Sequence, residues 1–228
     1  MNVHVTGVPS SLVDMMFMDR KEYNLVSGLS EADIVFFSRK TDVNPDLYHD
    51  VKRLTTMVSD PDDKRDLGTW DLIGGCRDIL KVGVDCGAQF LNVMNGGQMF
   101  QYCDRHIASH DCVYVNSLGQ REQYAVNSTH SQLMRMGGDG ILWGYTFQST
   151  YRNRGADQNR PVKREEGPDV EIIWYPDTSS LCFQPHPEYQ SSKTTRTLFF
   201  DCLERAILYI EDPPAGSVKP PLPTHPHE

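Results

Sequence analysis

Stretches with the hydrophobic patterns of strands and helices alternate through the first half of the chain. Residues 1–8 (MNVHVTGV) have the pattern of a first strand, and residues 13–24 that of a helix. Residues 32–38 (ADIVFFS) form a continuous apolar run, which is typical of a parallel strand buried on both faces. Beyond them the pattern predicts a helix interrupted by glycines at residues 65–80, a short strand at 81–84 and a helix at 87–94.

The second half of the chain has the pattern of a sheet followed by one long helix. Strand-like segments lie at residues 112–117, 122–128, 140–147, 171–176 and 181–186. Apolar residues at helical spacing follow at 194–210, and the polar stretch at 151–169 predicts a long loop. This alternation predicts a single α/β domain at residues 1–210, with a central, mostly parallel sheet flanked by helices.

Length and charge narrow the classes of function. A chain of 228 residues can bury the core of one such domain. Its net charge of −9 argues against a surface built for nucleic acid. No apolar run approaches the length of a membrane span, and the first residues have the pattern of a strand rather than a signal peptide. We therefore expect a cytoplasmic protein without a membrane partner.

The cysteines and the C-terminal residues add little chemistry. The six cysteines include no C-x-x-C pair and no metal-type spacing. We expect them to be reduced, most of them as small core residues, and we expect neither a metal site nor a cofactor. Residues 211–228 are rich in proline and lack apolar periodicity, which predicts an extended, poorly ordered tail.

Candidate chemistry begins at residues 82–97 (VGVDCGAQFLNVMNGG), which have the outline of a strand, a tight turn and a helix. This is the geometry of a nucleophile elbow, whose strained apex residue needs small neighbours. Gly83 and Gly87 provide them, and the N-terminus of the helix would stabilise a developing oxyanion. The residue at the apex is Asp85, however, and the thiol of Cys86 comes one position later.

A histidine and a glutamate two residues apart follow the last strand-like segment, in the stretch FQPHPEY. Side chains at this spacing point the same way along an extended chain, so the Glu188 carboxylate can orient the His186 imidazole. A thiol nucleophile requires such a pair of base and orienting group. The elbow and this pair together predict a site of nucleophilic chemistry.

These stretches resemble the class I glutamine amidotransferases, especially their γ-glutamyl hydrolase-like branch, which includes bacteriophage-encoded members. ADIVFFSRKTDVNPDLY resembles the strand and loop of that branch, and CGAQFLNVMNGG resembles the helix after its elbow. VNSTHSQLM resembles a substrate-side segment, and FQPHPEY matches the triad motif. The resemblance implies flavodoxin-like layering, His186 and Glu188 as triad members, and Gln89, His130 and Gln132 on the ligand side.

Two positions depart from the pattern of that family. Its elbow is G-x-C-x-G, and Asp85 holds the cysteine position here. Its oxyanion loop carries a pair of glycines, which are replaced by Arg39 and Lys40. Two long side chains would fill the space of a substrate carbonyl, so we interpret the site as one that has lost glutamine hydrolysis. Together with His130 and His186, the two cations would favour an anionic ligand, unless they belong to a solvated loop.

Three functional hypotheses follow. In the first, the pocket binds a glutamine-like or anionic small molecule, or serves regulation, without hydrolysing glutamine. In the second, Cys86 acts with His186 and Glu188 as an active C–N hydrolase or amidotransferase on glutamine or γ-glutamyl amides. A helical residue points about 100° away from its predecessor, which turns Cys86 away from the apex. In the third, Asp85 serves a different hydrolase as nucleophile or general base.

The resemblance also bears on partners and location. Family amidotransferases often pass ammonia to a synthetase or ligase, so a protein partner of that kind is implied. If the chain is encoded by a bacteriophage, its expected location is the cytoplasm of the host.

Overall fold

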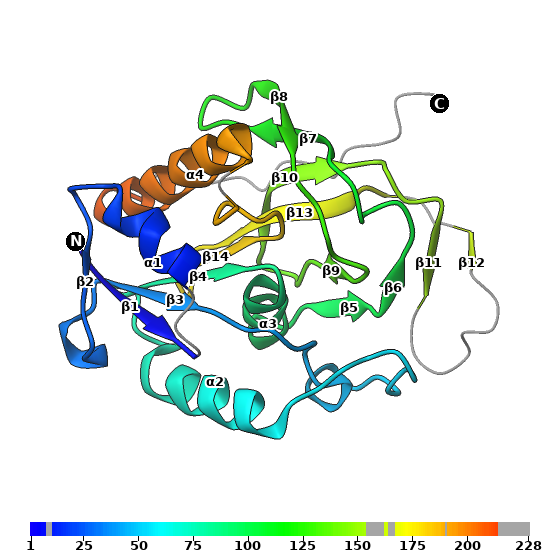
Figure 1. Cartoon of the computed structure of the whole chain (residues 1–228), viewed down its shortest axis with the longest axis horizontal. Coiled ribbons are helices and arrows are strands. Elements are labelled where there is room, and N and C mark those ends of the chain that lie inside the picture. The colour runs from blue at the N-terminus through cyan, green and yellow to red at the C-terminus, as the bar shows by residue number, and fades with distance from the viewer. Residues whose placement is uncertain (8–10, 154–161, 164–166, 190, 214–228) are drawn as a thin grey trace.

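The computed structural model describes residues 1–7, 11–153, 162–163, 167–189 and 191–213. Within this part of the chain, eleven strands form one mixed sheet and three short strands form a second sheet. Helices cover both faces of the larger sheet (Figure 1).

One half of the large sheet is parallel and holds the N-terminal strands together with the last strand of the chain. All four of its neighbouring pairs run in the same direction. In spatial order its strands are β2 (Asn24–Leu25), β1 (Asn2–Thr6), β3 (Ile34–Phe37), β4 (Leu80–Val84) and β14 (Ser180–Phe183).

The other half of the large sheet is antiparallel. From β14 outwards its strands are β13 (Asp169–Tyr175), β10 (Ile141–Thr146), β7 (His110–Val115) and β8 (Arg121–Val126). β9 (Leu133–Arg135) pairs with β13 and with β5 (Gln98–Phe100). The second sheet joins β12 (Val162–Lys163), β11 (Tyr151–Asn153) and β6 (Tyr102–Cys103).

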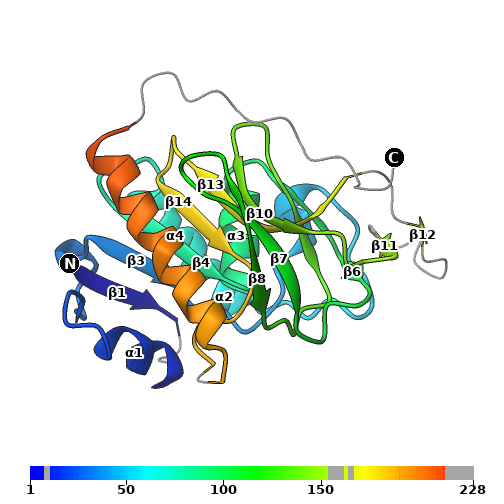
Figure 2. The same cartoon turned by 90° about the horizontal axis from the view of Figure 1, so that it is seen from above.

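The helices form one layer on each face of the parallel half (Figures 1 and 2). α1 (Ser11–Met18) and α4 (Lys193–Glu211) lie on one face, and α2 (Asp60–Ile73) and α3 (Cys86–Met94) lie on the other. Short 3₁₀ turns at Leu29–Glu31 and Pro45–Tyr48 complete the connections. The predicted α/β domain with helices on both faces of the sheet is confirmed.

Strand β3 shows why its sequence is apolar throughout. Ile34 and Phe36 belong to the core beneath α1 and α4, whereas Val35 and Phe37 belong to the core beneath α2 and α3. All four residues are buried. A central parallel strand has no solvated face, so the alternation of side chains places apolar groups in both layers.

Three predicted segments differ from the structure. The helix expected at residues 13–24 is α1, which ends at Met18, and the last predicted helical residue belongs to β2. The helix expected at residues 65–80 is α2, which starts five residues earlier and ends before the glycine pair. Its polar first turn is stabilised as a helix start, because the Ser59 side chain accepts a hydrogen bond from the Asp62 amide and acidic residues favour this end. The predicted loop at residues 151–169 contains the short strands β11 and β12, which pair with each other.

Two further expectations concern the ends of the molecule and its surroundings. None of the described helices is long and apolar enough to cross a membrane. The tail predicted at residues 211–228 begins at the last residue of α4, and residues 214–228 lie outside the described part of the chain.

Candidate functional site

Three adjacent parallel strands carry the candidate site at their carboxyl ends. β4 pairs with β3 on one side and with β14 on the other. β3 leads to Arg39 and Lys40, β4 leads to Asp85, and β14 leads to His186. The carboxyl ends of parallel strands in an open α/β sheet are where ligands bind, because the loops from neighbouring strands meet there.

The turn after β4 has the strained geometry of a nucleophile elbow. Asp85 has φ 48° and ψ −116°, a conformation that residues other than glycine rarely adopt. Glycines let the helix come close behind the turn. A Cβ added at Gly83 would lie 2.4 Å from the carbonyl carbon of Gly87, and one added at Gly87 would lie 2.0 Å from the Phe37 carbonyl oxygen. The elbow shape is therefore present with a carboxylate at its apex.

The predicted pair of base and orienting group is also assembled. Nδ1 of His186 lies 2.8 Å from Oε1 of Glu188. The imidazole stacks on the Tyr189 ring, with 4.8 Å between ring centroids. Asn127 holds the backbone of His186 through two hydrogen bonds, one to its carbonyl oxygen and one from its amide. These contacts leave Nε2 of His186 facing the elbow.

The carboxylate of Asp85 lies in the space in front of that nitrogen. Oδ2 of Asp85 is 3.7 Å from Nε2 of His186, and Oδ1 accepts a hydrogen bond of 2.9 Å from the Gln184 side chain. The hydroxyl of Thr129 lies 2.8 Å from the same Nε2. Asp85 is thus held at the apex by an ion pair and an amide.

The charges around His186 determine its protonation. Burial lowers its pKa, but the hydrogen bond to Glu188 and the charges of Asp85 and Glu188 outweigh that effect, so its pKa is raised above 6.5. Burial also raises the pKa of the Asp42 carboxyl, and the negative charge of Asp85 adds to the rise. The site is consequently acidic, with an imidazole that favours the charged form.

Cys86 is poorly suited to replace the missing thiol. Its sulfur lies 3.5 Å from Oδ2 of Asp85, to which it donates a hydrogen bond. Burial raises its pKa well above the usual value, and the negative charges of Asp85 and Asp42 raise it further. Among the described residues, the side-chain hydrogen bonds of His186 go to Glu188 and Thr129. A thiolate at Cys86 is therefore disfavoured.

Arg39, which the sequence suggested as an anion-binding residue, pairs with carboxylates of the protein itself. Its side chain is fully buried, and its guanidinium pairs with Asp63 at 2.7 Å and with Asp66 at 2.9 Å, both on α2. It also donates to the carbonyl oxygens of Thr41 and Asp42. These contacts neutralise its charge and fix the loop after β3 to α2. Lys40 is exposed.

The predicted ligand-side residues Gln89, His130 and Gln132 are buried, and each has one side-chain polar atom without a hydrogen-bond partner. The side-chain nitrogen of Gln89 (Nε2) donates to the side-chain oxygen of Gln184 (Oε1) at 3.5 Å. His130 contacts the carbonyl oxygen of Gln132 at 2.9 Å. Its other ring nitrogen faces Glu171. The structure thus brings Gln89 near the elbow and places His130 in a neighbouring cluster.

Sequence reasoning missed three residues that contact the centre of the site. Thr129 and Asn127 lie in the segment after β8, and Gln184 lies two residues before the triad histidine. Each lies within a few residues of a recognised motif, but its side-chain direction depends on how the loops meet. The only signal in the sequence that could have indicated these residues was their closeness to the recognised motifs.

Comparisons of the fold identify related structures. A candidate GMP synthase subunit from Thermoplasma acidophilum matches with a TM-score of 0.57 and 14% identity, covering 92% of this chain and 96% of that one. A glutamine amidotransferase from Thermotoga maritima matches with a TM-score of 0.54 and 12% identity, covering 92% and 88%. The PurLQS structure from Thermotoga maritima matches with a TM-score of 0.51 and 13% identity, covering 92% and 99%.

Sequence comparisons add no closer relative. No family model matches the chain, and no curated protein matches it significantly. The structural matches extend over nearly the whole chain, and at 12–14% identity they show a shared fold. The chain therefore has the fold of the class I glutamine amidotransferase-like proteins.

Proposed function

We propose that this protein is an amidotransferase-like protein of the γ-glutamyl hydrolase-like branch that binds a small ligand without hydrolysing glutamine. The observation that carries the proposal is the position of Asp85. Its carboxylate stands at the apex of an intact elbow, 3.7 Å from Nε2 of a histidine that Glu188 orients.

The chemistry of a carboxylate explains why hydrolysis would be lost. A thiol transfers its proton to the imidazole and attacks the amide as a thiolate, whereas an ionised carboxylate has no proton to give. Attack by Asp85 on an amide would form an anhydride and expel an amine, which is a far worse leaving group than a carboxylate. Asp85 instead faces Nε2 of His186, and with Glu188 its charge raises the pKa of the imidazole.

The same charges favour a glutamine-like ligand over an anionic one. The charges of Asp85 and Glu188 act on the imidazole, and the charges of Asp42 and Asp85 act on each other. The guanidinium of Arg39 is neutralised by two carboxylates of α2. An anion would be repelled by the carboxylates. An amide or ammonium group could donate hydrogen bonds to them.

A protein partner is the second part of the proposal. One structural neighbour comes from the PurLQS structure. An amidotransferase-like module that keeps its fold and lacks its nucleophile could still dock on a synthetase or ligase and regulate it. Copurification with a partner from the native source would support this part.

Turnover measurements test the loss of hydrolysis. Purified wild-type protein should release no ammonia from glutamine or γ-glutamyl amides above background. Cys86→Ser and Asp85→Asn serve as matched variants. Turnover that disappears in Cys86→Ser would support an active hydrolase that uses the thiol, and turnover that disappears only in Asp85→Asn would support a hydrolase that uses the carboxylate. Either result contradicts the proposal.

Restoring the thiol tests whether the rest of the site is intact. In a background of Cys76→Ser and Cys86→Ser, Asp85→Cys adds one thiol at the apex, since the other four cysteines are buried. Its pKa, measured by the pH dependence of alkylation, should fall below the ~8.5 of a free cysteine. Adding Glu188→Gln should reverse part of that fall. An ordinary thiol pKa would show that the elbow and the histidine do not form a catalytic pair.

A further inference from the structure

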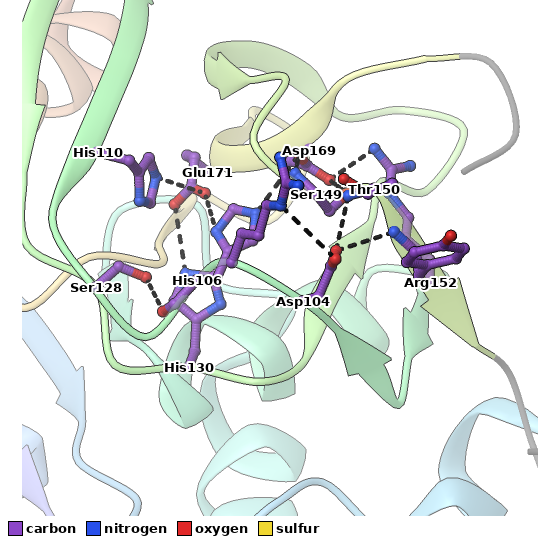
Figure 3. A network of polar contacts seen from close by, with 12 residues as sticks. Asp104, His106, His110, Ser128, His130, Ser149, Thr150, Arg152, Asp169 and Glu171 are labelled. Atoms are coloured by element: carbon purple, nitrogen blue, oxygen red, sulfur yellow. Dashed lines mark hydrogen bonds and ion pairs between the residues drawn. The ribbon is translucent and has the colours of Figure 1, made fainter. Parts of the chain in front are cut away.

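A cluster of three histidines surrounds one buried glutamate beside the candidate site. Glu171 lies on β13, His110 starts β7, and His106 and His130 lie on the loops before β7 and after β8 (Figure 3). All four side chains are buried. The proposed function makes no use of them.

The nitrogen and oxygen atoms of this cluster lie close enough together to face one common point. Nδ1 of His106 is 3.3 Å from Oε1 of Glu171, and Nε2 of His130 is 3.8 Å from Oε2. One ligand atom from each of these three residues lies within 4.8 Å of the others. Nitrogen and oxygen ligands of a tetrahedral zinc ion lie about 3.3–3.5 Å apart, so a separation of 4.8 Å must close by about 1.3–1.5 Å.

The hydrogen bonds of His130 set the direction of its lone pair. Nδ1 lies 2.9 Å from the carbonyl oxygen of Gln132, which can only accept, so Nδ1 carries a proton. In the neutral ring Nε2 is then an unprotonated nitrogen facing a carboxylate oxygen. Nε2 of His130 and Oε2 of Glu171 are both buried without a hydrogen-bond partner. Two acceptors in this arrangement repel unless a cation lies between them.

His106 is arranged in the same way. Both of its ring nitrogens are buried without a hydrogen-bond partner, although each lies near a carboxylate. Nε2 is 3.5 Å from Oδ2 of Asp169, and Nδ1 faces Glu171. A histidine that binds a metal through one nitrogen commonly directs the other towards a carboxylate, which orients the ring.

The charge balance of the cluster also calls for a cation. Arg152 pairs with Asp169 at 2.6 Å and compensates its charge. Among the described residues, the ion-pair partners of Glu171 are histidines alone. A fully buried carboxylate requires a compensating positive charge, and three imidazoles supply one only when a proton or a metal ion is added.

We propose that His106, His130 and Glu171 bind a divalent transition-metal ion of the zinc class. Two imidazole nitrogens and a carboxylate oxygen suit zinc and its neighbours better than calcium or magnesium, which prefer oxygen ligands. His110 supports the site from outside, because its Nε2 contacts Oε1 of Glu171 at 3.3 Å. This inference departs from the absence of a metal site expected from the cysteine spacing.

The ion would join loops that also hold the candidate site. His130 directly follows Thr129, whose hydroxyl contacts His186. On the other side of the cluster, the backbone amide of Gln184 donates a hydrogen bond to the backbone carbonyl oxygen of Glu171. Metal binding at the cluster would therefore fix the segment after β8 against the imidazole. Such a site contributes to folding stability, because the unfolded chain does not hold its ligands together.

Metal content is the direct test. The untagged full chain is unfolded in denaturant with a chelator, refolded with and without zinc, dialysed and analysed by elemental mass spectrometry. We expect about one zinc ion per chain after refolding with zinc, and a higher Tm than for the metal-free protein. X-ray absorption should show nitrogen and oxygen ligands at about 2.0–2.2 Å and no sulfur.

Matched variants assign the ligands. Glu171→Gln and His130→Gln keep the side-chain size and should lose the bound zinc together with the zinc-dependent gain in Tm. His49→Gln on the exposed turn after β3 and a double change of His225→Ala and His227→Ala in the tail should keep both. If wild type refolds without binding zinc, or if the tail variant alone loses the ion, the proposal is wrong. Should the ligand variants fail to fold, wild type refolded with cobalt still decides. Tetrahedral cobalt absorbs visible light far more strongly, and at longer wavelength, than octahedral aqueous cobalt, so wild type without these intense bands would contradict the proposal.

Discussion

At the residue scale, the ionisation of His186 depends on two carboxylates that play different parts. Glu188 bonds Nδ1 at 2.8 Å, and Asp85 faces Nε2 at 3.7 Å. Burial opposes the charged imidazole, but these groups raise its pKa above 6.5. Removing either charge should lower the pKa, and Glu188→Gln should lower it more than Asp85→Asn. The measurement is an NMR titration of the His186 ring, with the exposed Glu122→Gln as a control that leaves the pKa unchanged.

This pKa also affects stability in a definite direction. A histidine whose folded-state pKa is raised stabilises the fold fully below its unfolded pKa of about 6.5, and the contribution is lost as the pH rises through the folded pKa. The advantage of wild type over Glu188→Gln in the free energy of unfolding should therefore be larger at acidic pH and shrink at alkaline pH. An advantage that grows with pH would contradict this account.

Arg39 illustrates a cation whose role is structural. Its guanidinium pairs with Asp63 and Asp66 and is fully buried. Arg39→Met should lower the free energy of unfolding by about 3–5 kcal/mol, because it leaves Asp66 with one fewer partner in the interior. Lys40→Met on the exposed neighbouring position should change it by less than about 0.5 kcal/mol. Denaturant unfolding measures both. Equal stability of the two variants would return Arg39 to the candidate ligand-binding residues.

At the element scale, the approach of α3 to β3 and β4 depends on the absence of a side chain at Gly87. An added Cβ would lie 2.0 Å from the Phe37 carbonyl oxygen, which is backbone of a buried strand and cannot move freely. Gly87→Ala should therefore lower the free energy of unfolding by about 1–3 kcal/mol or more. The elbow would shift with it, since Asp85 immediately precedes α3.

Gly68 provides the matched control in another helix. It lies inside α2, and an added Cβ would have no heavy atom within 4 Å. Gly68→Ala should raise the free energy of unfolding by about 0.5–1 kcal/mol, because alanine restricts the unfolded chain and favours the helix. If both alanines have the same effect, close packing behind the elbow is not what selects glycine at Gly87.

At the scale of the whole molecule, the two core layers and the mixed sheet are built from residues that precede the end of α4. The composition of residues 212–228 offers little apolar surface for that core. Truncation after Glu211 should therefore leave the Tm of the domain unchanged in a thermal unfolding experiment. A Tm several degrees lower would show that the tail packs on the domain. A partner-dependent role of the tail would instead appear in binding measurements with both forms.

Local patterns in the chain were sufficient for the central part of the fold and for two parts of the site. The apolar run of β3, the glycine spacing around the elbow and the His186-Glu188 pair all act over a few residues, where backbone geometry determines which side chains share a face. The start of α2 was misjudged because its first turn is polar and its helix depends on capping by Ser59. The strands β11 and β12 were missed for a similar reason, since short polar strands have no hydrophobic signature.

The roles of the charged residues were decided by contacts between distant segments. Arg39 pairs with carboxylates more than twenty residues further along the chain, and Glu171 meets histidines from two separate loops. Sequence spacing carries no information about such encounters, because they depend on which loops the sheet order brings together and on the need of buried charges for partners. Sequence motifs therefore identified the elbow and His186. Only the packed structure showed that Arg39 is neutralised by carboxylates of α2 and that a cluster suited to a metal ion lies beside the elbow.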